Sequence, residues 1–142
     1  DYFMAHRSGS DRTYALGIGG FFVGHALFIA SAATRLHFSE MALVVGLLLL
    51  GLYAAFLRLH IMPKLPETLK IPAIAYTMIS VLGFTLSLMT GDFRYALSIA
   101  LLLFSDTMIA EADFAGNRRA DLLVLPTYYL CHILVAASAI LM

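Results

Sequence analysis

Charged residues are scarce in this chain of 142 residues. Only 13% of the residues are Asp, Glu, Lys or Arg, whereas 61% are hydrophobic, and the mean hydropathy is +0.89. Soluble domains contain about a quarter charged residues, and a soluble chain this short could not bury so much apolar surface. Intrinsic disorder is excluded as well, because disordered chains combine low hydrophobicity with high charge. The composition therefore predicts an integral membrane protein.

The chain also lacks an excess of charge of either sign and any pair of cysteines. Nine basic and nine acidic residues cancel, so no nucleic-acid partner is expected. The single cysteine, Cys131, has no partner for an internal disulfide and is expected to pack as a small apolar residue. No zinc-type cysteine cluster, HExxH sequence, glycine-rich phosphate loop or cleavable signal is visible. We therefore expect neither a metal nor a cofactor.

Long apolar runs are what the chain has in abundance. A helix needs about 20 apolar residues to span a bilayer, and the runs do not alternate with period two as the strands of a membrane β-barrel do. The predicted fold is an all-α transmembrane bundle, a single domain over residues 1–142. Its five spanning helices are expected at residues 14–33, 41–57, 71–89, 95–112 and 122–142. Because the chain opens on Asp1 rather than Met, we expect the domain to be truncated at its N-terminus.

Basic residues predict how the bundle is oriented. If all five segments span, Arg35 and Arg94 fall on one side, and the other side holds Arg7, Arg12, Arg58, Lys64, Lys70, Arg118 and Arg119. Cytoplasmic loops of multi-pass membrane proteins are enriched in Lys and Arg. The side with seven basic residues is therefore expected to be cytoplasmic, in the inner or plasma membrane if the source is bacterial.

Small residues predict where two helices approach each other closely. Gly20 and Gly24 form a GxxxG pattern within the first segment. Such patterns allow the backbones of neighbouring membrane helices to come together. We expect close helix packing at these two glycines rather than a chemical role.

Asp106 is the main candidate for chemistry. An Asp at the centre of a spanning helix costs roughly 2.5–3.5 kcal/mol on insertion scales, so it should face a protein-lined or wet cavity. Ionisable groups at such depth mark functional sites more often than not. The alternative is an Asp near a helix end that bonds to the neighbouring hydroxyls of Ser105 or Thr107.

Two histidines are further candidates. His25 stands in the middle of the first segment among phenylalanines, and His132 follows Tyr128 at the i,i+4 spacing that places both on one helix face. Pro126 removes a backbone donor and is expected to kink the last helix beside that pair. For both histidines a hydrogen-bonded structural role remains open. A polar cluster near the fourth helix end is expected to be a solvated cap, with two arginines able to attract a lipid phosphate; it consists of Glu111, Asp113, Arg118, Arg119 and Asp121.

Several short motifs, taken in order, resemble the YhhN family of membrane lysoplasmalogenases. They are Asp1, Phe21-Phe22-Val23-Gly24-His25, Tyr76, Ser105-Asp106 and Pro126-Thr127-Tyr128-Tyr129, and they span almost the whole chain. Two departures from the family pattern are His132, where the family usually has Gln, and the absence of a Gly shortly before Ser105. The resemblance implies an eight-helix bundle, of which this chain would hold the last five helices.

The resemblance also implies an activity and a site. The family hydrolyses the vinyl-ether bond of lysoplasmalogens, releasing a fatty aldehyde and a glycerophospho-ethanolamine or glycerophospho-choline. The implied partners are the lysophospholipid substrate and the bilayer, and the two implicated carboxyls correspond to Asp1 and Asp106. The residues expected to form the substrate pocket are His25, Tyr76, Ser105, Tyr128, Tyr129 and His132. If these assignments hold, Asp1, His25, Asp106 and Tyr128 converge on one cavity that opens towards the cytoplasmic leaflet.

Two other functions remain open. In the first, the chain binds or transports a lipid without chemistry, and Asp106 and His25 form a polar lock between helices. In the second, the chain is a metal-dependent hydrolase with His25, His132 and Asp106 as zinc ligands. The ligands would then come from three different helices without a ligand-type spacing. The oligomeric state is open in every case.

Overall fold

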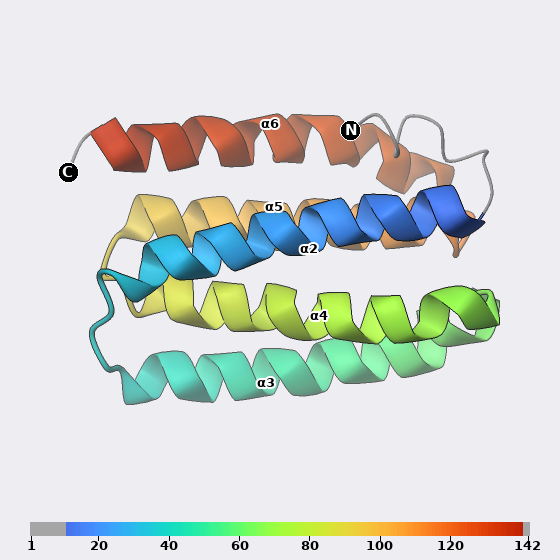
Figure 1. Ribbon diagram of the computed structural model, residues 1–142, viewed down its shortest axis with the longest axis horizontal. Coiled ribbons are helices and arrows are strands. Elements are labelled where there is room, and N and C mark those ends of the chain that lie inside the picture. The colour runs from blue at the N-terminus through green and yellow to red at the C-terminus, as the bar shows by residue number, and fades with distance from the viewer. Residues whose placement is uncertain (1–10, 141–142) are drawn as a thin grey trace.

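The computed structural model describes residues 11–140, which form antiparallel helices lying side by side (Figure 1). The helices are α2 (Asp11–Ala33), α3 (Glu40–Phe56), α4 (Glu67–Leu88), α5 (Phe93–Asp113) and α6 (Arg118–Ile140). A π-helical turn, η1 (Leu57–Ile61), and a 3-10 turn, η2 (Met62–Lys64), continue α3. The described residues contain no strand, and five helical spans among them are long and apolar enough to cross a bilayer. The predicted all-α membrane fold is thus confirmed.

The helices extend past several of the apolar runs from which they were predicted. Helix α4 begins at Glu67 instead of residue 71, and α6 begins at Arg118 instead of residue 122. Beyond residue 57, η1 and η2 prolong the helical path of α3 as far as Lys64. Charged residues do not end a membrane helix, because long side chains can reach the head-group region from its terminal turns. Hydropathy therefore located the apolar part of each helix and missed its polar ends.

Side-chain caps fix two helix starts at one end of the bundle. Ser39 Oγ accepts a hydrogen bond from Ala42 N at the start of α3. Asp92 Oδ1 accepts from Arg94 N and Tyr95 N at the start of α5, and Ser138 Oγ donates to the other oxygen of Asp92. The Ser138 hydroxyl, with the two backbone N–H groups, holds the pKa of Asp92 below its usual range. The cap thereby ties α6 to the start of α5.

Helix α4 lies at the centre of the bundle, packed against α2, α3 and α5, while α5 and α6 form the most extensive pair. Gly46 makes the α3–α4 approach possible, because a Cβ there would lie 2.3 Å from Thr85 Oγ1. The expected packing at Gly20 and Gly24 is not formed within residues 11–140, since a Cβ at either position would meet no described atom within 4 Å. A GxxxG pattern shows that a backbone can be approached, and the partner helix decides whether it is.

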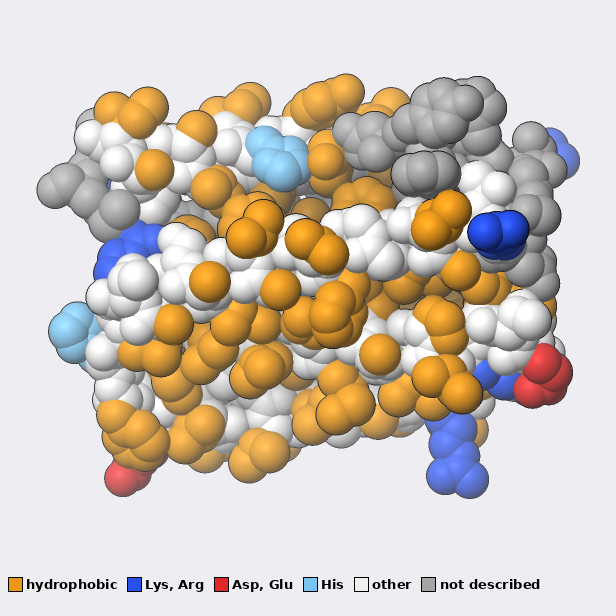
Figure 2. Space-filling view, in the orientation of Figure 1, with side chains coloured by type: hydrophobic (Ala, Val, Ile, Leu, Met, Phe, Trp, Pro, Cys, Tyr) orange, Lys and Arg blue, Asp and Glu red, His pale blue; other side chains and the backbone are white. Residues whose placement is uncertain are grey.

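The surface has the distribution expected of a membrane protein. Figure 2 shows hydrophobic side chains over the middle of one face and charged side chains near the two ends. Large apolar side chains face outward, including those of Leu47, Leu48 and Ile133. Cys131 is fully buried, in agreement with its predicted packing role.

The antiparallel order places the basic residues as predicted. Arg12, the α3–α4 connection and the start of α6 lie at the same end, which holds six of the eight described Lys and Arg residues; the other end holds Arg35 and Arg94. We call the first of these the basic end. The positive-inside rule predicts that this end faces the cytoplasm.

Candidate active site

Asp106 lies inside the bundle, between two apolar clusters. Tyr14, Ile61, Leu65 and Leu69 are buried near the basic end, while Ala32, Tyr95 and Ile99 are buried near the other. At the helical rise of 1.5 Å per residue, Asp106 stands about 10 Å from the last residue of α5 and about 20 Å from its first. Its side chain is only 9% exposed. The carboxyl is therefore deep in the bundle and closer to the basic end.

Two side chains from other helices contact the same oxygen of Asp106. Tyr76 on α4 donates its hydroxyl to Asp106 Oδ2 over 2.6 Å. His25 on α2 places Nε2 3.6 Å from Oδ2, and its ring meets the Tyr76 ring edge to face at a centroid distance of 5.2 Å. A hydroxyl proton directed at a carboxyl oxygen stabilises the ionised form. The sequence motifs on α2, α4 and α5 thus come together around Oδ2.

The other oxygen, Oδ1, is available for a ligand. Within residues 11–140 it receives no hydrogen bond. Oδ1 is also partly accessible. Among residues 11–140, His25 Nε2 is the single side-chain N or O atom that is both fully buried and without a hydrogen-bond partner, so Oδ1, which has no partner, is not fully buried. Asp106 therefore uses one oxygen to hold its position and presents the other to open space.

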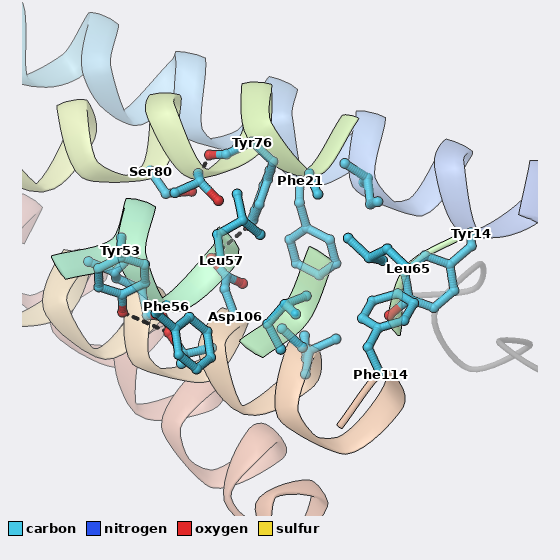
Figure 3. Close-up of a pocket in the computed structure, with 18 residues that line it drawn as sticks. Tyr14, Phe21, Tyr53, Phe56, Leu57, Leu65, Tyr76, Ser80, Asp106 and Phe114 are labelled. Atoms are coloured by element: carbon cyan, nitrogen blue, oxygen red, sulfur yellow. Dashed lines mark hydrogen bonds between the residues drawn. The ribbon is translucent and has the colours of Figure 1, made fainter. Parts of the chain in front are cut away.

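That space is a cavity of about 100 Å³ between α2, α3, α4 and α5. Figure 3 shows Tyr53 and Ser80 towards one end of it, Tyr14, Leu65 and Phe114 towards the other, and Asp106 between them. A volume of this size has room for several water molecules or a small reacting group. Because Tyr14 and Phe114 belong to the basic end, the cavity extends from Asp106 towards that end.

Hydroxyl groups accompany Asp106 in an otherwise apolar and aromatic lining. Tyr53 Oη and Thr107 Oγ1 lie 2.7 Å apart. Since Thr107 donates its proton to the Leu103 carbonyl over 2.8 Å, Tyr53 is the donor to Thr107. The lone pairs of the Tyr53 oxygen remain free to accept a hydrogen bond. Tyr53 is not among the site residues predicted from the sequence, because a tyrosine at the polar end of an apolar segment is also typical of the aromatic belt of membrane proteins.

At the basic end two acidic residues tie helices together. Asp113 Oδ2 accepts a hydrogen bond from Tyr14 Oη over 2.5 Å, and Glu111 Oε1 lies 3.0 Å from His60 Nε2. Tyr14 also packs edge to face on Phe114 at 5.1 Å. These carboxylates were expected to form a solvated cap with the arginines that follow. The structure instead shows that Asp113 joins α5 to α2 and that Glu111 joins α5 to η1.

The site residues predicted on and beside α6 lie outside the cavity lining. Ser105 is fully buried and donates to the Val124 carbonyl on α6 over 3.0 Å, so it links two helices. Tyr128 packs edge to face on Phe21 and on His132. Tyr129 is 59% exposed and His132 is also exposed. Of the expected pocket residues, the structure brings His25 and Tyr76 to Asp106, and of these only Tyr76 lines the cavity.

Two further predictions concern a metal and Asp1. No group of three His, Cys, Asp or Glu side chains within residues 11–140 is arranged to hold a metal ion, so His132 does not join His25 and Asp106 in a zinc site. Asp1, the second carboxyl implied by the family resemblance, lies outside the described residues.

Fold and site together define a multi-pass helical membrane protein with a buried carboxyl in an internal cavity. The chain belongs to the YhhN family, whose model matches residues 1–139 and thus confirms the resemblance carried by the motifs. Comparisons with curated proteins and with solved structures gave no match.

Proposed function

We propose that this protein is a membrane hydrolase that cleaves the vinyl-ether bond of lysoplasmalogens. The products are a fatty aldehyde and a glycerophospho-ethanolamine or glycerophospho-choline. Membership of the YhhN family supports the reaction class. The observation that carries the proposal is the position of Asp106, a deeply buried carboxyl in an apolar cavity with one oxygen that no residue of the described chain bonds.

The reaction needs an acid that can reach a carbon atom. A protonated Asp106 transfers its proton from Oδ1 to the β-carbon of the vinyl ether, which leaves an oxocarbenium ion and a carboxylate. The Tyr76 hydroxyl stabilises that carboxylate through Oδ2. Water then adds to the cation and returns a proton to the carboxylate, and the hemiacetal collapses to aldehyde and alcohol. A carboxyl buried in an apolar cavity suits this role, because removal from bulk water favours the protonated acid.

The direction of the cavity fits a single-chain phospholipid. The cavity has mainly apolar walls and runs from Asp106 towards the basic end. Lys and Arg residues at that end attract a lipid phosphate, while the reacting bond lies deeper, beside the carboxyl. The cavity lining within residues 11–140 contains a single carboxyl, that of Asp106. The role of Asp1 as the second carboxyl of the reaction therefore rests on the resemblance.

Replacing Asp106 with Asn in the full-length protein tests the proposal. General acid catalysis contributes about 10²–10⁴-fold to a rate, so D106N should lose at least about 100-fold in aldehyde release from lysoplasmalogen in lipid nanodiscs. Glu111→Gln is the matched control. Glu111 lies on the same helix as Asp106, but its carboxyl contacts His60 and does not line the cavity.

Three outcomes are informative. Loss of activity in D106N with activity retained in E111Q supports the mechanism. Aldehyde release by D106N at the wild-type rate removes Asp106 from the reaction. If the wild-type protein binds lysoplasmalogen and releases no aldehyde, the hydrolase proposal is wrong and the lipid-binding alternative takes its place.

A further inference from the structure

His25 contains an unusual atom. Its Nε2 is fully buried and has no hydrogen-bond partner, and no other side-chain N or O atom in residues 11–140 shares this state. An unsatisfied buried polar atom costs about 1–3 kcal/mol, and native structures keep few of them. The atom therefore calls for an explanation, and its position 3.6 Å from Asp106 Oδ2 supplies one.

The tautomer of neutral His25 follows from its other nitrogen. Nδ1 lies 3.1 Å from the Phe21 carbonyl oxygen. A carbonyl only accepts, so Nδ1 carries a proton and Nε2 carries a lone pair, at 3.6 Å from Asp106 Oδ2. The α4 backbone covers the ring at Gly83, where a Cβ would lie 3.8 Å from His25 Cδ2. The imidazole is thereby held in place by both α2 and α4.

The other titratable neighbours of Asp106 do not compete for its proton. These neighbours are three tyrosines and a cysteine that interact electrostatically with the carboxyl: Tyr53 on α3, Tyr76 on α4, and Tyr128 and Cys131 on α6. Phenols and thiols are ordinarily neutral near pH 7. Within the described chain His25 is the single base within ion-pair distance of Asp106.

We propose that His25 is a positioning residue that shares one proton with Asp106. The proton moves between Nε2 and the carboxyl, giving either two neutral groups or an imidazolium–carboxylate pair of the same total charge. His25 does not line the cavity, so it acts through Asp106. The shared proton itself does not depend on the proposed function; only its consequence in turnover does. During turnover, His25 would offer a second site that can accept the proton released by the attacking water.

Infrared titration of the full-length protein in nanodiscs tests the pair without substrate. The protonated carboxyl band of Asp106 is identified by its loss in D106N. Two interacting groups release protons in two macroscopic steps, so the wild-type band should change in two steps as the pH rises. In His25→Gln, which keeps polarity and approximate size, the band should disappear in one step. The midpoint of that step should lie about 0.3–1 pH unit below the upper wild-type step, because one of two proton sites is gone.

The pH–rate profile supplies a second measurement that a purely structural role would not alter. In H25Q the upper limb of the kcat profile should shift to lower pH by the same amount, whereas a packing defect lowers kcat at every pH. His37→Gln is the control, since His37 is exposed in the α2–α3 connection and lies away from the cavity. Both its band and its profile should match the wild type.

The outcomes separate this inference from the proposed function. A one-step band in the wild type, or an upper limb that shifts to higher pH in H25Q, overturns the shared proton. If the wild-type band changes in two steps but the protein releases no aldehyde, the shared proton is supported and the hydrolase proposal is wrong. If H25Q does not fold, the wild-type band still decides, because its assignment needs only D106N.

Discussion

Replacing Tyr76 with Phe isolates the hydrogen bond that holds the Asp106 carboxyl. The substitution keeps the ring that packs on His25 and removes a single hydroxyl, 2.6 Å from Oδ2. A hydrogen bond to a charged group contributes about 1.5–3 kcal/mol. The carboxyl becomes fully ionised only after it has protonated the substrate, so this energy is gained mainly in the transition state. At about 1.4 kcal/mol per tenfold change in rate, Y76F should lower kcat by about 10- to 100-fold.

The assay is steady-state aldehyde release by the full-length protein in nanodiscs, with kcat and KM determined separately. KM should change little, since the hydroxyl bonds to Asp106 rather than to the lipid. Tyr95→Phe is a matched control, because Tyr95 is buried and donates a bond of the same 2.6 Å length to the Phe28 carbonyl, far from the cavity. Y95F should lower thermal stability and leave kcat near the wild-type value. A kcat for Y76F within twofold of wild type would refute the reasoning.

Two further predictions concern the fold. Gly46→Ala should lower the free energy of unfolding by about 1–3 kcal/mol, because the added methyl group overlaps a side chain of α4. Gly51→Ala on the same helix meets open space and should be neutral or stabilising, and equal stability of the two variants in a thermal unfolding assay would contradict the α3–α4 packing. Because its native pKa is lowered, Asp92 stabilises the fold above the unfolded-state pKa of about 3.9, and that contribution is lost as the pH falls through the lower native value. The drop in unfolding temperature between pH 5 and pH 3 should therefore be smaller in Asp92→Asn, and an unchanged drop would show that the cap carries no such charge effect.

Much of the fold was predictable from the sequence, because a bilayer restricts the solutions so strongly. Each apolar run had to form a helix, since a backbone in hydrocarbon must satisfy its own hydrogen bonds. The ends of the helices were predicted less accurately, as at Glu67 and Arg118, because the polar turns outside the bilayer carry no apolar signal. Glycine spacing was a poor guide to contact, since among residues 11–140 a neighbouring helix lies against Gly46 and not against Gly20.

The candidate site was predictable in part. Asp106 was conspicuous as a carboxyl in an apolar segment, and the family motifs singled out Tyr76 and His25. Their convergence on one carboxyl oxygen brings together residues that lie 81 and 30 positions before Asp106 in the sequence, and no local pattern specifies such contacts. Ser105 shows the limit most plainly, because its adjacency to Asp106 in sequence turns it about 100° around the helix, towards α6 and away from the cavity.

The sequence by itself determined that the chain crosses a membrane, which end carries the basic residues, and that a carboxyl lies at depth. These are properties of single segments, and hydropathy and charge act on each segment separately. Only the tertiary structure decided which oxygen of Asp106 is bound by Tyr76 and faced by His25, which oxygen is open, and which helices enclose the cavity. Those features depend on how the faces of several helices are rotated towards one another, and that rotation is set by close contacts such as Gly46 on Thr85 rather than by any one helix.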